Sequence, residues 1–448
     1  MPLCLAGISA PTLNADVPTY SNFELQARSN IVDGYNLPAG SSFNSGTIAV
    51  NDNGDVAFRL VSVGITGKPG VWFGGHGAGS VVYTAPSSQP TIGDPSLNSQ
   101  GFVTFQQYDF SLSDGVFVYD PLNDTTSVAV PPGGMFGFAF MSSPTINDSQ
   151  VIAFRGKDGA NRQGFYTDDA GLQTRYVGET SVDPSSPYAF LFTPAFNNNN
   201  EIAGKGRVGS TAGSAPDEIR LWSADGSSIL IAVDDDGDPA SPFTGFDNSV
   251  ALNDAGQVAF IASLVGGGRG VYLGDGSTTI EIATTADPDV SAVEFFAPEI
   301  NNNGLVAFRG KDGQGLYAIF VGDGSTLRRV IGEHDLLPTD LGTGRIDQHD
   351  GSVVFGGGLS INNHGDIGFN CALTPENNNQ IEWGSGMYVA YADPSLPGDL
   401  DGDCDVDQAD LGLLLASYLN DAGGDLDGDG DTDQADLGIL LANYGQSC

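Results

Sequence analysis

Two acidic stretches near the C-terminus have the composition of a metal-binding site. "DLDGDCDVDQAD" begins at Asp399 and is repeated as "DLDGDGDTDQAD" from Asp425. Each places six carboxylates within twelve residues without Lys or Arg, so the charges repel one another unless a cation neutralises them. The carboxylates occupy loop positions one, three, five, seven, nine and twelve, the ligand order of an EF-hand calcium loop. The predicted calcium ligands are Asp399, Asp401, Asp403, Asp405, Asp407, Asp410, Asp425, Asp427, Asp429, Asp431, Asp433 and Asp436.

Each acidic stretch leads into an apolar segment that the sequence predicts to be a helix. The first continues as "QADLGLLLASYL" and the second as "QADLGILLANYG". At position six, where the loop turns sharply, the second copy has Gly430 and the first has Cys404. A solvated acidic tail is the alternative, but a disordered tail has no reason to repeat both the ligand spacing and the apolar segment.

Two loop–helix units of this kind, 26 residues apart, resemble the dockerin domain. The resemblance covers residues 398 to about 445 and includes the Asp at position twelve of each loop. It implies two bound Ca²⁺ ions and docking onto a cohesin-like module through loop positions ten and eleven and the following helix. Those positions are Gln408-Ala409 and Gln434-Ala435 in this sequence, whereas hydroxylated pairs are common in the family.

One short phrase recurs through most of the chain that precedes these loops. Its copies are "VNDNGDVAFR", "LNSQGFVTFQ", "INDSQVIAFR", "FNNNNEIAGK", "LNDAGQVAFI", "INNNGLVAFR" and "INNHGDIGFN". The first Asn recurs at positions 51, 98, 147, 197, 253, 301 and 362, with spacings of 47 to 61 residues, the size of a four-stranded propeller blade. The third copy has Gln150 in place of Gly, and the fourth has Asn200 and Gly204 in place of Gly and Phe.

Each repeat predicts four short antiparallel strands. "NxxG" supplies the residues of a tight turn, "VAF" resumes with the alternation of a strand, and no helical periodicity occurs before residue 405. We therefore predict an all-β, seven-bladed β-propeller followed by a small α-helical calcium module. The segment from Phe23 aligns with the segment from Leu327 through Leu37-Pro38 and Leu337-Pro338. We expect this N-terminal strand to pair with residues 387–391, complete the last blade and close the ring.

The repeats resemble bacterial extracellular tandem-repeat proteins with an NxxGxxxF signature, over roughly residues 23–393. That resemblance implies anchoring or sorting domains joined to the repeats, and it implies no catalytic activity.

Side chains that recur in every repeat could bind ligands. An aromatic row could stack sugars, but its presence in every blade favours packing between sheets. The recurring Asn residues could form a ring of ligand-binding amides, although turn formation explains them without a ligand. The aromatic row is Trp72, Phe117, Tyr166, Trp222, Tyr272, Phe320 and Tyr388.

The longest insert, "GEHDLLPTDLGTGRIDQHDG", contains residue types that bind metals or act as acids and bases. We favour a solvated rim loop, because its first half aligns with residues 31–38, which lack His. "DDDGD" at residues 234–238 could hold a third calcium ion, but a solvated turn explains it. The candidates in the insert are Glu333, His334, Asp335, Asp347, His349 and Asp350.

Charge and composition narrow the partners and the compartment. A net charge of -40 with only 16 Lys and Arg excludes nucleic acid and anionic membranes as partners. No apolar run reaches the ~18 residues of a membrane span. We expect an extracellular or cell-surface location, because all-Asp calcium loops suit a calcium-rich exterior. A disulfide between Cys404 and Cys448 is an open alternative, whereas Cys371 is expected to be a buried thiol.

The predicted organisation has four parts. Residues 1–22 are a signal remnant and leader, 23–393 the propeller, 394–398 a linker and 399–448 the dockerin-like domain. The predicted function is a secreted, non-catalytic binding or scaffold protein, with a glycan or protein ligand on the propeller. The alternative is a polysaccharide-degrading glycoside hydrolase or lyase with its active site on the propeller face, although neither "GxSxG" nor "HExxH" occurs.

Overall fold

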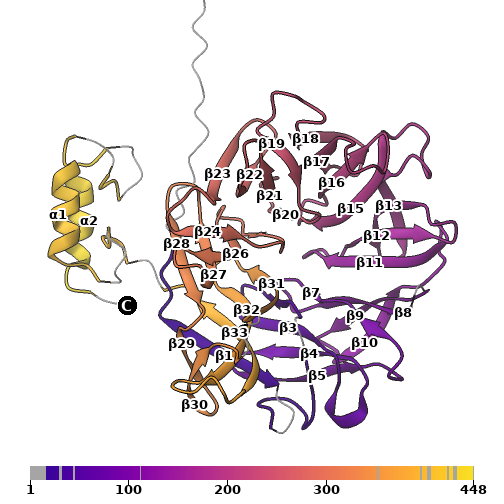
Figure 1. Ribbon diagram of the computed structural model, residues 1–448, viewed down its shortest axis with the longest axis horizontal. Coiled ribbons are helices and arrows are strands. Elements are labelled where there is room, and N and C mark those ends of the chain that lie inside the picture. The colour runs from indigo at the N-terminus through magenta and orange to yellow at the C-terminus, as the bar shows by residue number, and fades with distance from the viewer. Residues whose placement is uncertain are drawn as a thin grey trace, which may run out of the picture.

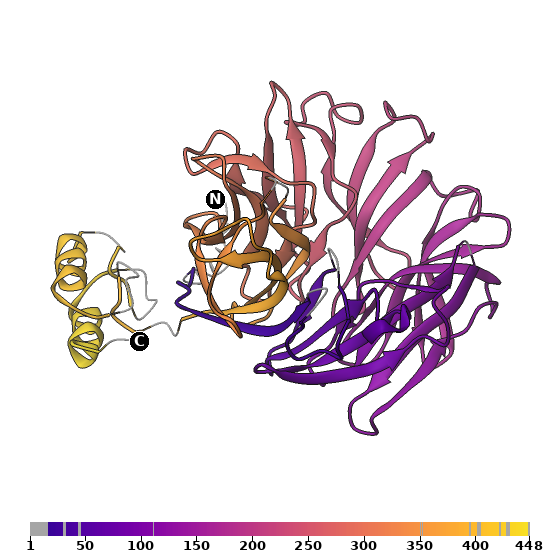
Figure 2. The ribbon, with the colours of Figure 1, turned by 60° about the horizontal axis from the view of Figure 1, so that its bottom comes forward.

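The computed structural model describes residues 17–29, 33–43, 46–110, 112–349, 351, 353–393, 396–400, 405–420, 423–426 and 431–446. These residues form seven antiparallel β-sheets arranged as blades around a central axis, with two short helices beside the ring (Figures 1 and 2). The predicted all-β fold with seven blades is therefore confirmed. Among the described residues, no helix has the length and apolar character needed to cross a membrane.

The first three blades follow the order of the repeats. The first contains β2 (Ile48–Val50), β3 (Asp55–Leu60), β4 (Gly70–Gly75) and β5 (Ala78–Thr84), with the 3₁₀ turn η1 (Gly64–Thr66) before β4. The second contains β6 (Thr91–Ile92), β7 (Ser96–Leu97), β8 (Val103–Asp109), β9 (Leu112–Asp120) and β10 (Thr125–Val130). The third contains β11 (Phe138–Ile146), β12 (Ile152–Asp158), β13 (Gln163–Asp169) and β14 (Leu172–Gly178).

The remaining blades repeat this plan. The fourth contains β15 (Tyr188–Phe196), β16 (Ile202–Val208), β17 (Asp217–Trp222) and β18 (Ser228–Val233). The fifth contains β19 (Phe243–Phe246), β20 (Ala251–Leu252), β21 (Val258–Leu264), β22 (Arg269–Gly274) and β23 (Thr279–Thr284). The sixth contains β24 (Val290–Val293), β25 (Glu299–Ile300), β26 (Val306–Asp312), β27 (Tyr317–Gly322) and β28 (Leu327–Gly332). The seventh contains β31 (Phe355–Ile361), β32 (Ile367–Pro375), β33 (Gly384–Tyr391) and β1 (Asn22–Ser29).

The N-terminal strand closes the ring as predicted. β1 runs antiparallel to β33, with Phe23 opposite Ala390 and Ala27 opposite Met387. Ala27 is fully buried in a cluster with Phe58 and Trp72 of the first blade. β1 therefore joins the first and last blades and pairs with the edge that β33 would otherwise leave open.

Aromatic packing explains the Phe of the signature and the aromatic row. In six blades the Phe of the second strand stacks on the aromatic residue of the third strand, with ring centroids 4.7 to 6.1 Å apart. Six members of the row are less than 9% exposed, and Phe117 is partly buried. The row therefore belongs to the core, as favoured from the sequence.

The fourth blade keeps this packing although Gly204 replaces its Phe. A side chain at Gly204 would collide with the Phe165 ring, 2.9 Å from an added Cβ. Phe165 instead makes an edge-to-face contact with Trp222 of the fourth blade, with centroids 5.5 Å apart. A ring from the third blade thus fills the space that the missing Phe leaves.

The long insert after the sixth blade is not the solvated rim loop that the sequence favoured. It forms a hairpin of β29 (Leu336–Thr339) and β30 (Gly342–Ile346), and β30 pairs with β32 of the seventh blade. The Tyr388 hydroxyl donates a 3.0 Å hydrogen bond to the Pro338 carbonyl. The hairpin thus extends the seventh sheet on the side opposite to β1.

Candidate functional site

The two helices begin at the predicted calcium loops. α1 (Gln408–Ser417) and α2 (Gln434–Asn443) have Asp407 and Asp433 as their N-caps. In each helix the N-cap carboxylate accepts from the backbone, and Asp410 or Asp436 accepts in return from the N-cap backbone N–H. Asp410 also accepts a 2.6 Å hydrogen bond from the Leu400 N–H. The position-twelve carboxylate therefore ties the start of the loop to its helix.

Three acids of each loop converge. One oxygen from each of Asp405, Asp407 and Asp410 lies within 4.8 Å of the others, and Asp431, Asp433 and Asp436 repeat the arrangement. Such groupings of oxygens are the donor set that hard cations prefer, so these residues fit calcium. Asp399 and Asp425, at position one, are partly buried. The other predicted ligands and the two cysteines lie outside the described residues, namely Asp401, Asp403, Asp427, Asp429, Cys404 and Cys448.

The two loop–helix units pack reciprocally. A Cβ added to Gly398 of the first unit would lie 3.0 Å from Leu440 Cα of α2, and one added to Gly424 would lie 3.1 Å from Leu414 Cα of α1. Leu414 and Leu440 are fully buried in a small cluster with Val406. Each unit thus covers the helix of the other, and neither builds this core alone.

The recurring Asn residues form a closed ring around the channel. In every blade the Nδ2 of this Asn donates to the backbone carbonyl of the equivalent Asn in the next blade, at 2.9 to 3.3 Å. Its Oδ1 accepts from two backbone N–H groups of its own turn, as Asn253 does from Ala255 and Gln257. The predicted turn role is therefore confirmed, and the link between blades is a second role that the turn chemistry did not predict.

A second series of hydrogen bonds between blades starts at the residue after six of the recurring Asn residues. Ser99 N–H donates to Asp148, Asn198 N–H to Asp254, and Asn363 N–H to Asp52, each in the next blade. Asn side chains hydrogen-bond the second oxygen of all three carboxylates. Acids from different blades thus converge at this mouth, but they link the blades rather than form an acid–base pair.

Away from the Asn turns, basic side chains also link neighbouring blades, through hydrogen bonds to backbone carbonyls. Lys205 Nζ donates to the Phe246 carbonyl, Arg155 to the Leu191 carbonyl and Arg309 to the Phe355 carbonyl, in each case in the next blade. Burial lowers the pKa of Lys205 and Arg309, whereas Asp217 and Glu294 beside them oppose this shift. These three cationic side chains therefore have hydrogen-bond partners within the propeller.

One channel residue was missed by the sequence reasoning. The position two residues before the recurring Asn is small or hydroxylated in six repeats, and Glu299 is the exception. Glu299 lines both cavities of the channel, of about 590 and 260 Å³. Burial raises its pKa to about 8. The signal in the sequence was this departure from the repeat. The seven residues are Ala49, Ser96, Thr145, Ala195, Ala251, Glu299 and Ser360.

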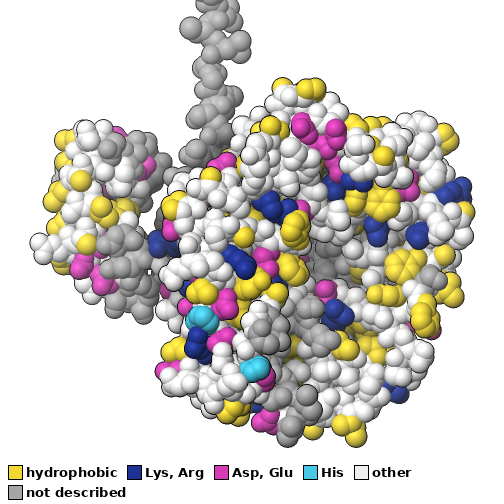
Figure 3. Space-filling model, viewed as in Figure 1, with side chains coloured by type: hydrophobic (Ala, Val, Ile, Leu, Met, Phe, Trp, Pro, Cys, Tyr) yellow, Lys and Arg dark blue, Asp and Glu magenta, His cyan; other side chains and the backbone are white. Residues whose placement is uncertain are grey.

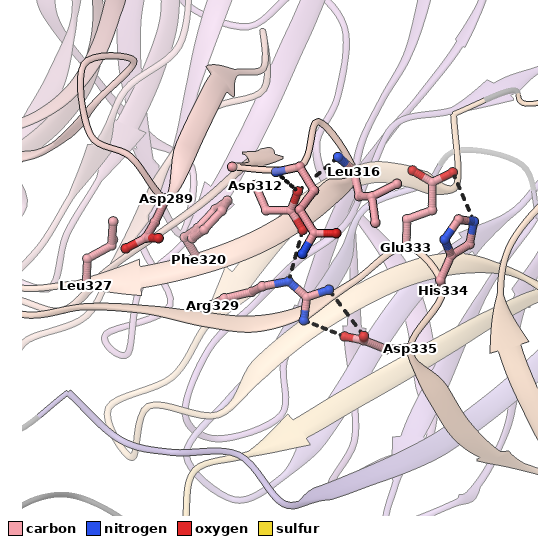
Figure 4. A pocket seen from close by; sticks show the side chains of 11 residues that line it. Asp289, Asp312, Leu316, Phe320, Leu327, Arg329, Glu333, His334 and Asp335 are labelled. Carbon is pink, nitrogen blue, oxygen red and sulfur yellow. Dashed lines mark hydrogen bonds and ion pairs between the residues drawn. The ribbon is translucent and has the colours of Figure 1, made fainter.

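Glu333, His334 and Asp335 of the insert border a cavity of about 750 Å³ (Figure 4). His334 Nε2 lies 3.9 Å from both Glu333 Oε1 and Asp347 Oδ2. Arg345 Nε lies 3.3 Å from the same Asp347 oxygen and neutralises its charge. The second oxygen of Glu333 accepts from the Tyr317 N–H. Both acids therefore have structural partners.

In other blades, too, an acid directly after the outermost strand accepts a hydrogen bond from a backbone N–H. Asp234 accepts from the Asp217 N–H at 3.0 Å, as Glu333 does from Tyr317. Glu179 accepts from the Leu191 N–H, and burial raises the pKa of both Asp234 and Glu179. Three of the candidates do not join His334: Asp335 pairs with Arg329, His349 donates its N–H to Glu382, and Asp350 lies outside the described residues.

A family model matches residues 29–312, and its description is a family of unknown function, DUF7453. The chain belongs to this family. No curated protein matches the sequence. Among solved structures, an oligogalacturonate lyase in complex with manganese is 12% identical, with a TM-score of 0.50 over 82% of this chain and 91% of that chain. The β-propeller domain of the Trilobed protease from Pyrococcus furiosus is 11% identical, with a TM-score of 0.48 over 75% of this chain and 92% of that chain. At these identities the likeness concerns the fold alone.

Proposed function

We propose that this DUF7453 protein is an exported, non-catalytic binding propeller that carries a calcium-dependent dockerin-like docking module. The observation that carries the proposal is the repeated cluster of three acids at the start of each short helix. Calcium would be held in the first loop by Asp399, Asp401, Asp403, the backbone carbonyl of Asp405, Asp407 and Asp410, and by the equivalent residues of the second loop. The bound ion would neutralise acids that otherwise repel one another and thereby stabilise the module.

The outer faces of the two helices support docking. Leu413, Leu415 and Leu441 are 43 to 55% exposed, and Gln408, Ala409 and Gly412 beside them are also exposed. No charged residue interrupts α1 or α2 after Asp410 and Asp436. An uncharged helical face with exposed leucines suits burial against another protein. The proposed partner is a cohesin-like module, through the resemblance of the loops to dockerins.

The polysaccharide-degrading enzyme is the rival reading, and the channel mouth argues against it. Hydrolysis or elimination needs an acid and a base that are free to exchange protons with the substrate. Asp52, Asp148 and Asp254 instead accept hydrogen bonds from the backbone and from Asn side chains of neighbouring blades. Release of new reducing ends from a panel of polysaccharides, lost in rim-carboxylate variants, would replace our proposal with the enzyme.

The docking proposal is tested by limited proteolysis of the full chain. With calcium, we expect residues 396–446 to resist cleavage and immobilised cohesin modules to retain the protein. A chelator should expose this segment while the propeller stays intact, and Asp410→Asn with Asp436→Asn should reproduce the chelator's effect. A tail whose cleavage and binding do not respond to calcium would rule out the docking module.

A further inference from the structure

The propeller channel contains one acid without a structural role. Glu299 lies in the walls of both channel cavities, and no hydrogen bond or ion pair joins its carboxylate to any residue that the structure describes. Asp52, Asp148 and Asp254, the other acids of the narrower cavity, all accept hydrogen bonds that link neighbouring blades. The space-filling view shows the surface hollowed at the centre of the ring of blades (Figure 3). Glu299 is therefore available to a ligand that enters the channel.

The charge of the walls selects a cationic ligand. The narrower cavity is lined by four acids and by no Lys, Arg or His among the described residues. The wider cavity adds one base, Arg59, which is paired with Asp94 at 2.5 Å. A negative ligand would meet uncompensated repulsion from these acids, whereas a cation would relieve it.

The arrangement of donors separates a primary amine from other cations. A multivalent metal ion needs several convergent ligands, and no three acids of the channel converge within the part of the chain that the structure describes. A quaternary ammonium group favours an aromatic cage, but Tyr108 and Phe196 are the only aromatic residues in the described walls of the wider cavity. A primary ammonium group needs one carboxylate and a few hydrogen-bond acceptors.

The other walls suit a hydroxylated ligand. The wider cavity, of about 590 Å³, has the size of a small-molecule site. Residues with hydroxyl groups from five blades line it, and a hydroxyl group can both donate to and accept from a polyol. They are Thr47, Ser96, Ser143, Thr145, Thr193 and Ser249.

We infer that the channel binds a small hydroxylated primary amine, with the ammonium group paired to the Glu299 carboxylate. The inference rests on the proposed binding role of the propeller and does not involve the calcium loops. Because burial holds the pKa of Glu299 at about 8, pairing with the amine releases a proton at pH 7. The charged groups that share the two cavities with Glu299 are Asp52, Asp148, Asp254, Arg59 and Asp94.

Isothermal titration of the full-length protein with 1-amino-1-deoxyglucitol tests this site, with glucitol as the uncharged analogue. We expect the amine to bind at least about tenfold more tightly than glucitol, which corresponds to one charge-assisted hydrogen bond. The heat at pH 7 should depend on the ionisation enthalpy of the buffer, as release of a proton requires. Glu299→Gln should lose at least about tenfold in affinity for the amine, and the exposed Glu376→Gln control should lose none.

Thermal unfolding of Glu299→Gln separates lost binding from lost folding, because an uncharged amide in place of this carboxyl group should leave the propeller at least as stable. Equal affinity for amine and polyol, absence of amine binding, or full binding by Glu299→Gln would each overturn the inference. Asp410→Asn with Asp436→Asn should leave amine binding unchanged, so that failure of the calcium proposal and failure of this one are told apart.

Discussion

The ring of Asn side chains makes a strong prediction about the stability of the propeller. Asn253 is 3% exposed and makes four hydrogen bonds: Nδ2 to the Asn301 carbonyl at 3.1 Å and to Gln257 Oε1 at 2.8 Å, and Oδ1 from two backbone N–H groups. Asn253→Ala removes all four and leaves the N–H groups of Ala255 and Gln257 without their side-chain acceptor, while the Asn301 carbonyl keeps its hydrogen bond from the Gly304 N–H. At about 1 kcal/mol for each hydrogen bond, and more for a group left unsatisfied, we expect a loss of about 3 to 5 kcal/mol.

Asn253→Asp separates the two roles of this side chain. A carboxylate still accepts from the two N–H groups of the turn, but it cannot donate to the Asn301 carbonyl. Facing that carbonyl in a buried site, the introduced acid should have a raised pKa. The folded state then binds the proton more tightly than the unfolded state, so the variant's stability should fall as pH rises above the acid's ordinary value.

Urea unfolding of both variants at pH 5 and pH 8 measures these effects, with the exposed Asn377→Ala as the control. The control should lie within about 0.5 kcal/mol of the wild type. If Asn253→Asp were as stable as the wild type at both pH values, the bond between blades would contribute nothing and our account of the ring would be wrong.

Three further predictions concern the closing strand, the channel and the free cysteine. Ala27→Glu should lower the free energy of unfolding by more than about 3 kcal/mol, because it buries a charge between the first and last blades, whereas Asn22→Glu at the exposed start of β1 should be near neutral. Burial raises the pKa of Glu299 from 4.5 to about 8, so the folded protein binds this proton more tightly than the unfolded chain does. The wild type therefore loses stability as the pH rises through 8, whereas Glu299→Gln does not. The variant should unfold at a higher temperature than the wild type above pH 8 and at the same temperature below pH 4. Cys371 is fully buried in β32 and burial raises its thiol pKa, so mass spectrometry should detect alkylation only after unfolding; modification of the native protein would contradict its position.

Much of the fold could be predicted from the sequence, because each repeat carries its own turn and strand signals. Asn and Gly at fixed spacing predicted the hairpins, and the Leu37-Pro38 alignment predicted that β1 would close the ring. The hairpin of β29 and β30 was missed. Pro338 and the polar residues around it are typical of a loop, and the pairing of β30 with β32, which stabilises the hairpin, is not visible in the local sequence.

The candidate sites also differ in whether the local sequence could predict them. Ligand spacing along one loop is local, so the acids of both calcium loops could be proposed directly. The partners of Asp52 and Glu333 come from other blades or from backbone N–H groups, which no local pattern specifies. Glu299 was visible only as the one acid at a position that is otherwise small or hydroxylated, and its place in the channel follows from the closed ring.

Calcium titration of the full-length, chelator-stripped protein by calorimetry tests the central claim most directly. We predict two ions per chain, one ion for Asp410→Asn, one for Asp436→Asn and none for the double variant. A chain that binds no calcium, or whose stoichiometry stays at two in the double variant, would contradict the assignment of these loops.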